Sequence, residues 1–327
     1  MANTYGLVSV IMPAYNAERT IEQSILSVLN QSYSQLELII VDDGSTDSTI
    51  SKVKSFFDHR IRLVSQPNQG VSVARNTGIC HSSGEFIAFL DSDDCWIANK
   101  LSVQIACLRA KNEIDFVFSS FKILTERGIF NGPVHTNRFT SSNTLGSRIL
   151  VSDYIGTLTV LLRKSILDKH SPLYFDPSLS GTEDWDLWIR VLQTARPLYI
   201  NTDLAYYRQS SSSLSGNFLF HHNEELKVLV KHEPLFNRYH PYCKSSAFIL
   251  WRLKALRYWL ILFDIPNMLR EIKALFHYNS LWSFVMAIPV LFPLSFFAHI
   301  VRRLGFQFST FLRFVPEYVD PPLSNVR

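Results

Sequence analysis

The stretch Phe86-Ile87-Ala88-Phe89-Leu90-Asp91-Ser92-Asp93-Asp94 decides how the rest of this chain is interpreted. Five apolar residues run directly into three carboxylates within four positions. The pattern predicts a buried strand that presents oxygen ligands at its C-terminal end. Mg2+ and Mn2+ prefer carboxylate oxygen and usually keep positions open for water and substrate phosphates. The stretch therefore fits a metal site for a diphosphate-bearing substrate.

A second interpretation of the same residues is an acidic surface turn in which Asp94 caps the following helix. The spacing alone does not choose between the two. A calcium loop of the EF-hand type is disfavoured, because it requires Gly at the sixth and Glu at the twelfth position from Asp91. Those positions hold Trp96 and Ser102.

Length and cysteine content indicate a cytoplasmic globular protein. The chain has 327 residues, which suits one large domain or two ordinary ones. Its four cysteines form no C-x-x-C pair, so neither a zinc knuckle nor a disulfide framework is predicted. The first seven residues lack the basic and apolar segments of a secretory signal.

The first half of the chain alternates between strand-like and helix-like segments, which predicts an α/β fold with a mostly parallel central sheet. Strands are expected at residues 7–12 (stopped by Pro13), 36–41, 60–65, 86–90, 114–121 and 157–162. Helices are expected at residues 21–29 with Asn16 as a plausible N-cap, 71–79, 97–108 and 183–192, and a loop at 206–217.

Polar clusters follow three of the expected strands. They are Pro13-Ala14-Tyr15-Asn16, Asp42-Asp43 and Asp91-Ser92-Asp93. Ligands of open α/β sheets bind at the carboxyl ends of strands. We therefore expect the three clusters to share one crevice. The run from Asp42 to Asp47 is also expected to cap the following helix, with Ser45 or Asp47 accepting from its free backbone amides.

The character of the chain changes after about residue 222. Residues 1–222 are expected to form the catalytic domain, and residues 223–327 a helical, basic and aromatic region that associates with a membrane. Beyond Cys243 there are ten Lys/Arg against four Asp/Glu, a net charge of +6, which leaves −2 for the rest. This charge suits an anionic membrane surface, whereas the high Leu and Phe content argues against nucleic acid as a partner.

Residues 281–301 are long and apolar enough to span a bilayer, but Pro289 and Pro293 interrupt them. An interfacial or re-entrant element is the preferred interpretation. A true span and a soluble helical core remain alternatives.

Five motifs together resemble one family, the family 2 inverting nucleotide-sugar glycosyltransferases. They are VSVIMPAYN at residues 8–16, VDDGSTD at 41–47, ARNTG at 74–78, FLDSDD at 89–94 and GTED at 181–184. Each motif is weak alone, but the set occurs in the family's order. The resemblance covers residues 7–215 and implies the GT-A fold, with a Rossmann-like nucleotide-binding domain.

The resemblance also implies roles for individual residues. The expected nucleotide-sugar pocket consists of Pro13, Tyr15, Asp42, Asp43, Asn68, Arg75, Asp91 and Ser92. Asp91 and Asp93 match the family's DXD motif, in which the first contacts the ribose region and the last coordinates the metal, Mn2+ or Mg2+. A divalent ion would offset the charge that develops on the departing diphosphate.

Asp184 matches the family's general base, which takes the proton from the acceptor hydroxyl. Glu183 would orient the acceptor or raise the pKa of the base, and Trp185 would offer a stacking face for a sugar. Without the resemblance, Glu183 and Asp184 would be interpreted as helix N-terminal carboxylates stabilised by the macrodipole.

One position departs from the family pattern. Many relatives carry a metal-binding histidine in a Tyr-Arg-x-His segment, whereas here Tyr207-Arg208-Gln209 is followed by Ser210. His221 or His222 is a possible substitute.

We therefore expect an inverting glycosyltransferase at the cytoplasmic face of the inner or plasma membrane. It would move a sugar from a nucleotide donor, with UDP preferred, to a glycan or lipid-linked hydroxyl in polysaccharide or lipopolysaccharide assembly. Two alternatives are an inactive sugar-nucleotide-binding scaffold and a nucleotidyltransferase. The nucleotidyltransferase is disfavoured because no Gly-rich loop with Arg and Lys follows the first strand.

Overall fold

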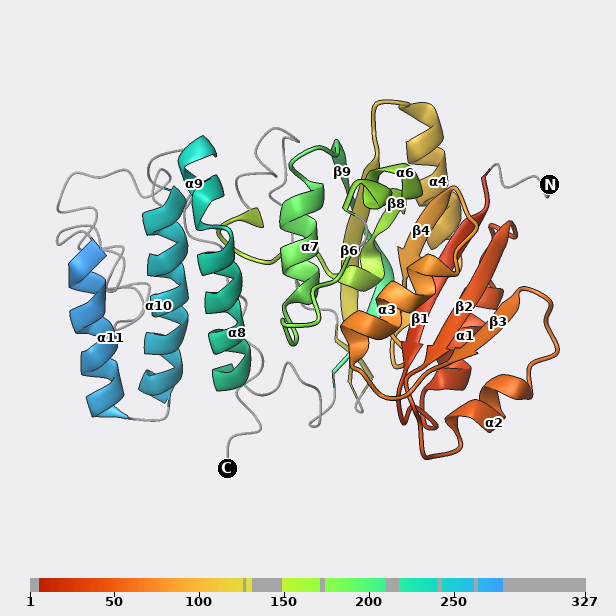
Figure 1. The fold of residues 1–327 in the computed structure, drawn as a ribbon, viewed down its shortest axis with the longest axis horizontal. Coiled ribbons are helices and arrows are strands. Elements are labelled where there is room, and N and C mark those ends of the chain that lie inside the picture. Colours follow the sequence, from red (N-terminus) through yellow and green to blue (C-terminus); the bar gives the residue numbers. More distant parts are fainter. Residues whose placement is uncertain are drawn as a thin grey trace. The chain divides into compact units, whose positions relative to one another are not determined.

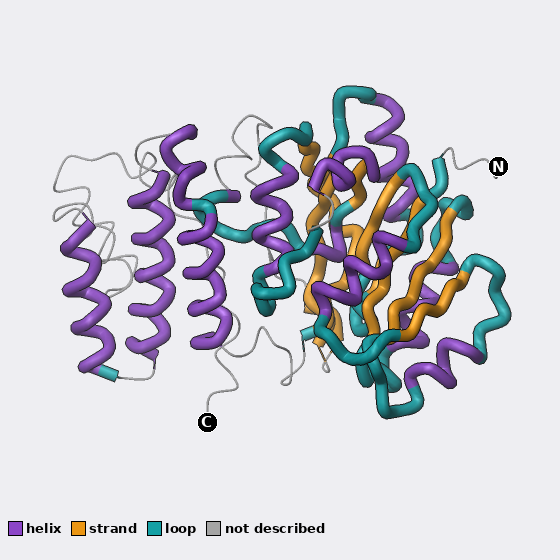
Figure 2. Tube along the Cα trace, viewed as in Figure 1, coloured by secondary structure: helices purple, strands orange, loops and turns teal. Residues whose placement is uncertain are grey.

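The computed structural model describes residues 6–125, 128–130, 149–170, 174–209, 218–239, 243–261 and 264–278. The chain divides into two compact units, Met1–Val228 and Leu229–Arg327. Figure 1 shows the course of the chain, and Figure 2 distinguishes the strands of the first unit from its helices.

The first unit is built on a mixed sheet with the strand order β3-β2-β1-β4-β8-β6-β9-β5 and with β7 paired to β6. The first four strands are β1 (Val8–Ala14), β2 (Leu36–Asp42), β3 (Ile61–Ser65) and β4 (Phe86–Phe89). They pair in parallel. The parallel α/β layout predicted from the sequence is confirmed for this half of the sheet.

The second half of the sheet is partly antiparallel. Its strands are β5 (Cys95–Trp96), β6 (Phe116–Thr125), β7 (Gly128–Phe130), β8 (Leu161–Arg163) and β9 (Pro197–Arg208). Strand β8 runs antiparallel between β4 and β6, whereas β9 runs parallel to β6 and antiparallel to β5. The strand expected at 157–162 is only half right, because a 3-10 turn, η2 (Thr157–Thr159), precedes β8.

Helices cover both faces of the parallel strands because successive side chains of a strand point to opposite faces. The even-numbered residues of β1 pack in one core cluster with α1 (Ile21–Leu29) and α4 (Lys100–Ala110). Helix α3 (Val71–Cys80) packs on the other face (Figure 1). A Cβ on Gly78 would meet Ile11 Cγ2 at 2.4 Å, so the absence of a side chain at residue 78 allows α3 its close approach to β1.

The remaining helices of the first unit are short, and α7 bears on the site. They are α2 (Thr49–Lys54), α6 (Lys164–Leu167), η3 (Asp168–His170) and α7 (Glu183–Val191). Trp188 of α7 packs in an aromatic cluster, with ring centroids 5.4 Å from Phe116, 6.1 Å from Phe89 and 6.3 Å from Phe175. Burial of these large rings fixes the position of α7 against the sheet.

The helices of the C-terminal part are α8 (Phe218–Lys231), which crosses the boundary between the units, α9 (Glu233–Tyr239), α10 (Cys243–Ile261) and α11 (Ile265–Tyr278). Helices α10 and α11 share an apolar core around Leu256 and Leu275. Arg252 of α10 pairs with Glu271 of α11 at 2.8 Å. None of the described helices combines the length and apolarity that crossing a bilayer requires. Residues 281–301 lie outside the described part.

Four local expectations differ from the structure. Strand β1 does not stop at Pro13 but continues to Ala14, whose carbonyl accepts from Asp43 N–H at 2.8 Å. The N-cap of α1 is Thr20, whereas Asn16 adopts a left-handed φ of 48°. Asp94 caps no helix, because Asn99 precedes α4 at the cap position. The loop expected at 206–217 begins later, since Tyr206 and Arg208 belong to β9 and residues 210–217 are not described.

Candidate active site

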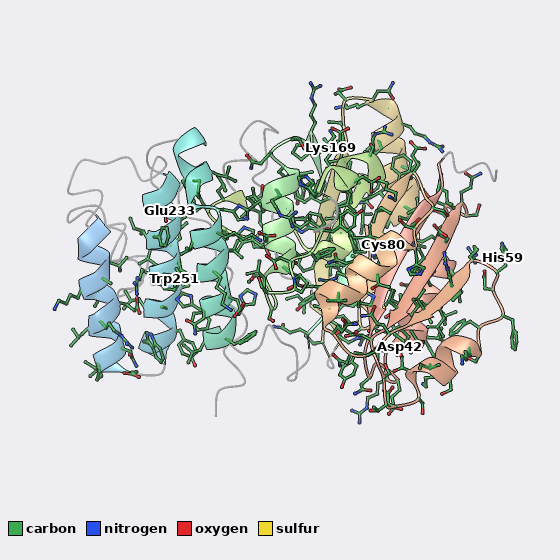
Figure 3. All side chains as sticks on the ribbon, in the orientation of Figure 1. Asp42, His59, Cys80, Lys169, Glu233 and Trp251 are labelled. Carbon is green, nitrogen blue, oxygen red and sulfur yellow. The ribbon has the colours of Figure 1, made fainter. Side chains whose placement is uncertain are left out.

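The loops that follow β1 and β2 are tied together by hydrogen bonds. Ser45 Oγ accepts from Asn16 N–H at 3.0 Å, and Asp47 Oδ2 accepts from Glu18 N–H at 3.0 Å. Thr46 N–H in turn donates to Asn16 Oδ1 at 2.9 Å. Asp47 Oδ1 also accepts at 2.9 Å from the N–H of Thr49, the first residue of α2, so Asp47 covers a free amide of that helix as expected, although Ser48 holds the N-cap position. These bonds fix the edge of the sheet where Asp42 lies (Figure 3).

Asp43 organises the loop after β3. Its carboxylate accepts from the Gln66 side chain at 2.7 Å, from Gln69 N–H at 3.0 Å and from Gly70 N–H at 2.8 Å. Thr77 donates to Gln66 Oε1 at 2.7 Å, which links α3 to the same loop. Three hydrogen bonds leave about one of the four lone-pair positions of a carboxylate for a ligand.

The other residues expected at the nucleotide lie around this turn. The preceding Asp42 is buried, and its Oδ1 accepts from Ser45 N–H at 3.3 Å. Gly44 has a φ of +78°, and a Cβ there would meet Asn68 N at 2.9 Å, so the turn lies directly against Asn68. Tyr15 is 51% exposed. Pro13, in contrast, is buried within β1.

Arg75 joins the two acidic parts of the site. Its Nη1 donates to Glu183 Oε1 at 2.6 Å, and its Nη2 donates to both oxygens of Asp91 at 2.8 and 3.0 Å. Burial alone lowers the pKa of the Arg75 guanidinium, but the carboxylates of Asp91, Glu183 and Asp184 outweigh this effect and raise it above its usual value. Arg75 thus remains a cation that connects the loop after β4 to the start of α7.

The acidic loop after β4 is anchored by Arg208. The Arg208 backbone N–H donates to Asp94 Oδ1 at 2.7 Å, and its Nε donates to the Asp93 carbonyl at 2.7 Å. Its Nη2 donates to Gln23 Oε1 at 2.6 Å. The Ser92 carbonyl accepts from Ser24 Oγ at 2.9 Å. The loop is therefore held from β9 and from α1.

Two carboxyls of this loop have raised pKa values. Burial, with a further contribution from Asp91, raises the pKa of Asp93 to about 6. Burial, together with Asp93 and Asp91, also raises the pKa of Asp94. A nearby cation favours the ionised form of a carboxyl. The loop is thus chemically suited to a divalent ion at Asp93.

The residues that would hold this ion are Asp91 and Asp93, a hard oxygen donor set of the kind that Mg2+ and Mn2+ prefer. Such ions usually take further ligands from water and substrate phosphates. Within the described ranges, no group of three or more His, Cys, Asp or Glu side chains is arranged to hold a metal by itself. Two carboxylates fit a site that substrate oxygen completes.

The expected histidine position, Ser210, is outside the described residues. His221 of α8 lies near the loop before α7, since a Cβ on Gly181 would approach its Cδ2 at 3.8 Å. Its Nδ1 lies 3.8 Å from Glu225 Oε1, and His222 Nδ1 lies 3.8 Å from Glu225 Oε2.

The first turn of α7 carries the expected catalytic pair. Asp184 Oδ2 accepts from Thr157 Oγ1 at 2.7 Å, and its Oδ1 accepts from Trp185 N–H at 2.8 Å. Glu183 is buried beside it. Burial raises the pKa of Glu183, to which Asp184 adds, while Arg75 opposes the shift. The expectation that Trp185 stacks on a sugar is wrong, because this side chain is buried and donates its Nε1–H to the Ile149 carbonyl.

Comparisons with known proteins identify the family of the chain. Residues 9–168 match the profile described as glycosyl transferase family 2. The chain is 41% identical, over 64% of its length and 80% of the relative's, to the Escherichia coli UDP-Glc:alpha-D-GlcNAc-diphosphoundecaprenol beta-1,3-glucosyltransferase WfgD. The chain belongs to glycosyl transferase family 2. It is a glycosyltransferase, which removes the nucleotidyltransferase alternative.

Solved structures support the GT-A fold of this family 2 glycosyltransferase. S. aureus TarS 1-349 in complex with UDP-GlcNAc matches with a TM-score of 0.56 and 19% identity, over 80% of this chain and 89% of that one. The Pyrobaculum calidifontis mannosyltransferase PcManGT, in complex with GDP-Man and Mn2+, matches with a TM-score of 0.54 and 17% identity, over 92% and 88%. The fold predicted from the sequence is confirmed.

Two site residues were not assigned roles from the sequence. Arg208 was noted only as part of a motif, although its place two residues before the expected histidine position could have indicated a role at the site. Thr157 gave no signal, because a single threonine at the start of an apolar segment is ordinary. Only the folded chain brings it to Asp184, 27 residues away in sequence.

Proposed function

We propose that this family 2 glycosyltransferase moves a sugar from a UDP-sugar, with UDP-glucose as the first candidate, to a hydroxyl of a lipid-linked or growing glycan, with inversion at the anomeric carbon. The observation that carries the proposal is the Arg75 bridge. It connects Asp91, on the loop suited to a metal and diphosphate, with Glu183, which adjoins Asp184. One buried network thus joins the donor side of the site to the base.

The donor would bind at the carboxyl ends of β1, β2 and β4. The exposed ring of Tyr15 would be available to the nucleobase, and Asp43 and the turn against Asn68 would contribute to the same pocket. Pro13 of β1, Asp42 of β2 and Ser92 of the loop after β4 would complete the proposed pocket. A Mn2+ or Mg2+ ion held by Asp93 and Asp91 would supply charge stabilisation for the leaving diphosphate.

Asp184 would act as the general base. Hydrogen bonds from Thr157 and from Trp185 N–H orient its carboxylate at the first turn of α7. Two accepted bonds leave about two lone-pair positions for the acceptor hydroxyl. Abstraction of that proton while the oxygen attacks from the face opposite the diphosphate inverts the anomeric centre. Glu183 faces Arg75, which supports a role in orientation and not in proton transfer.

The proposed acceptor follows from the relatives and from the C-terminal charge. WfgD is named for transfer from UDP-Glc to GlcNAc-diphosphoundecaprenol, a lipid-linked sugar. Ten basic residues after Cys243 against four acidic ones would favour an anionic membrane surface. We place the enzyme peripherally on the cytoplasmic face of the membrane, in cell-surface polysaccharide or lipopolysaccharide assembly.

The test is release of UDP from a panel of UDP-sugars, with and without Mn2+, in the presence of a synthetic GlcNAc-diphosphate lipid. Wild type is compared with Asp93→Ala, Asp184→Asn and the remote control Asp58→Asn. We expect metal-dependent release with one preferred donor, retained in the control and lost in the two site variants. Binding of UDP with Mn2+ but turnover of no donor would favour the inactive-scaffold alternative. Failure to bind UDP would overturn the uridine assignment.

A further inference from the structure

One of the hydrogen bonds to the Asp184 carboxylate comes from a buried backbone turn. Thr157, whose Oγ1 donates to Asp184 Oδ2 at 2.7 Å, is the first residue of the 3-10 turn η2. The three residues of this turn are buried. A hydroxyl on a buried backbone turn has little freedom to point elsewhere, so its direction depends on how the turn itself is held.

The turn is held through three consecutive backbone carbonyls, each of which faces a side-chain donor. Trp96 Nε1 donates to the Leu158 carbonyl at 2.8 Å, Gln104 Nε2 donates to the Thr159 carbonyl at 2.7 Å, and Lys100 Nζ lies 3.4 Å from the Val160 carbonyl. We call these donors, Trp96, Lys100 and Gln104, the turn clamp.

The turn clamp is itself buried and internally connected. Lys100 Nζ donates to Gln104 Oε1 at 2.7 Å and lies 4.1 Å from the Trp96 ring centroid. Lys100 and Gln104 are fully buried. A buried cation is costly unless its hydrogen bonds are satisfied. Both Lys100 and the Val160 carbonyl that it approaches are therefore constrained to their present places.

The turn clamp follows the acidic donor loop directly in the chain. Asp91–Asp94 ends where β5 begins, Trp96 lies in β5, and Lys100 and Gln104 lie in the next helix, α4. One continuous segment, residues 91–104, thus begins with the donor-side carboxylates and ends with side chains that donate to the turn that orients the base. The general-base role of Asp184 does not by itself require that this segment contact the turn.

We propose that Thr157 is a positioning residue for the transfer reaction: its hydroxyl fixes the direction of the Asp184 carboxylate, and the turn clamp holds that hydroxyl in place. The inference rests on the proposed role of Asp184 as the base. Among the described residues, the Thr157 hydroxyl donates to the proposed base and to none of the residues proposed to bind the nucleotide. Its loss should therefore lower kcat and leave the KM for the donor nearly unchanged.

The experiment measures kcat and the KM for UDP-glucose with a synthetic GlcNAc-diphosphate lipid as acceptor, in the full chain. Thr157→Val removes the hydroxyl and keeps the shape, and Thr157→Ala removes it without placing a methyl group at the hydroxyl position. Thr157→Ser restores a hydroxyl. The matched control is Thr159→Val, since Thr159 Oγ1 donates within the same turn to the Gly156 carbonyl at 2.7 Å and not to Asp184. Asp184→Asn tests the underlying assignment, and thermal melting shows which variants are folded.

We expect kcat to fall about 10- to 100-fold in Thr157→Val and Thr157→Ala, because a misplaced catalytic group costs rate in that range. Thr157→Ser should recover to within about threefold of wild type, and Thr159→Val should lose less than about threefold. A donor KM within about threefold of wild type would mark the loss as catalytic.

Three results would overturn the inference. Wild-type kcat in both hydroxyl-free variants, with Asp184→Asn inactive, would refute the positioning role and leave the base assignment intact. Equal losses in Thr157→Val and Thr159→Val would assign the effect to the turn and not to the hydroxyl. Full activity of Asp184→Asn would refute the base assignment, and the positioning role would fall with it.

Discussion

Replacing Arg75 with methionine should destabilise the first unit severely. The change keeps an apolar stem of similar length but removes a cation whose side chain is 5% exposed, as is that of its partner Glu183, at a distance of 2.6 Å. Breaking a buried ion pair by removing one partner costs about 3–5 kcal/mol, because it leaves a buried charge uncompensated. The contact with Asp91, whose side chain is 33% exposed, adds at most about 1 kcal/mol.

A double-mutant cycle isolates the pair. Glu183→Gln removes the buried charge and leaves an amide oxygen near Arg75, so we expect it to cost about 1–3 kcal/mol. In the double variant no uncompensated charge remains, and its cost should fall below the sum of the two single costs by about 2 kcal/mol. Urea denaturation followed by tryptophan fluorescence gives these free energies of unfolding when the m value is unchanged.

A matched surface pair provides the control. Arg60 contacts Asp58 through Nε at 3.0 Å and Nη2 at 2.8 Å, in similar geometry, but their side chains are 21% and 23% exposed. Arg60→Met should cost about 1 kcal/mol or less. A loss below about 1 kcal/mol in Arg75→Met, or additive costs in the cycle, would refute the argument that burial makes the Arg75 network important.

Three further predictions concern packing, pH and the donor loop. Gly78→Ala should lower the free energy of unfolding by about 1–3 kcal/mol, because its Cβ would meet Ile11 Cγ2 at 2.4 Å; an unchanged melting temperature would contradict this. Burial lowers the pKa of Lys100 well below 10.5, so the native state binds fewer protons than the unfolded chain between the two values and stability rises with pH there by up to about 1.4 kcal/mol per unit. Lys100→Met should flatten that rise below pH 10.5, and an identical slope would refute it. Arg208→Ala should raise the donor KM at least about tenfold, because it releases the loop that Arg208 anchors at Asp93; an unchanged KM in the UDP-release assay would argue against this anchor.

Local pattern alone predicts the elements with a clear apolar run or helical period. Strands β1, β2 and β4 are such apolar runs and are buried in the sheet, and helix α1 follows a helical apolar period; the structure confirms them, together with the shorter and less buried β3 and with α3. Strand β9 was missed because three consecutive polar residues, Asn201, Thr202 and Asp203, interrupt the alternation of apolar and polar residues that a half-buried strand would show. Pro13 was taken as a strand end because proline lacks a backbone N–H donor. In the structure it lies opposite Val41 of β2, beyond Ile11, the last residue of β1 that is paired with β4.

The residues of the site also divide into those that the sequence could indicate and those that it could not. Residues within motifs, such as Asp91 and Asp184, could be proposed from sequence because neighbouring polar residues at strand or helix ends are informative. The residues that contact and orient these carboxylates could not be proposed from the sequence. Thr157, Trp96 and Lys100 reach the site through pairings that only the folded sheet creates, and Trp185 looks like a sugar platform until its burial is known.

The most direct test of the central claim is the anomeric configuration of the product. The donor selected by the UDP-release panel is supplied as its α-linked UDP-sugar with the GlcNAc-diphosphate lipid, and the new linkage is identified by NMR. Attack assisted by Asp184 from the face opposite the diphosphate predicts a β-linked product, and no product from Asp184→Asn. An α-linked product would contradict inversion, and with it the assignment of Asp184 as the base of a single displacement.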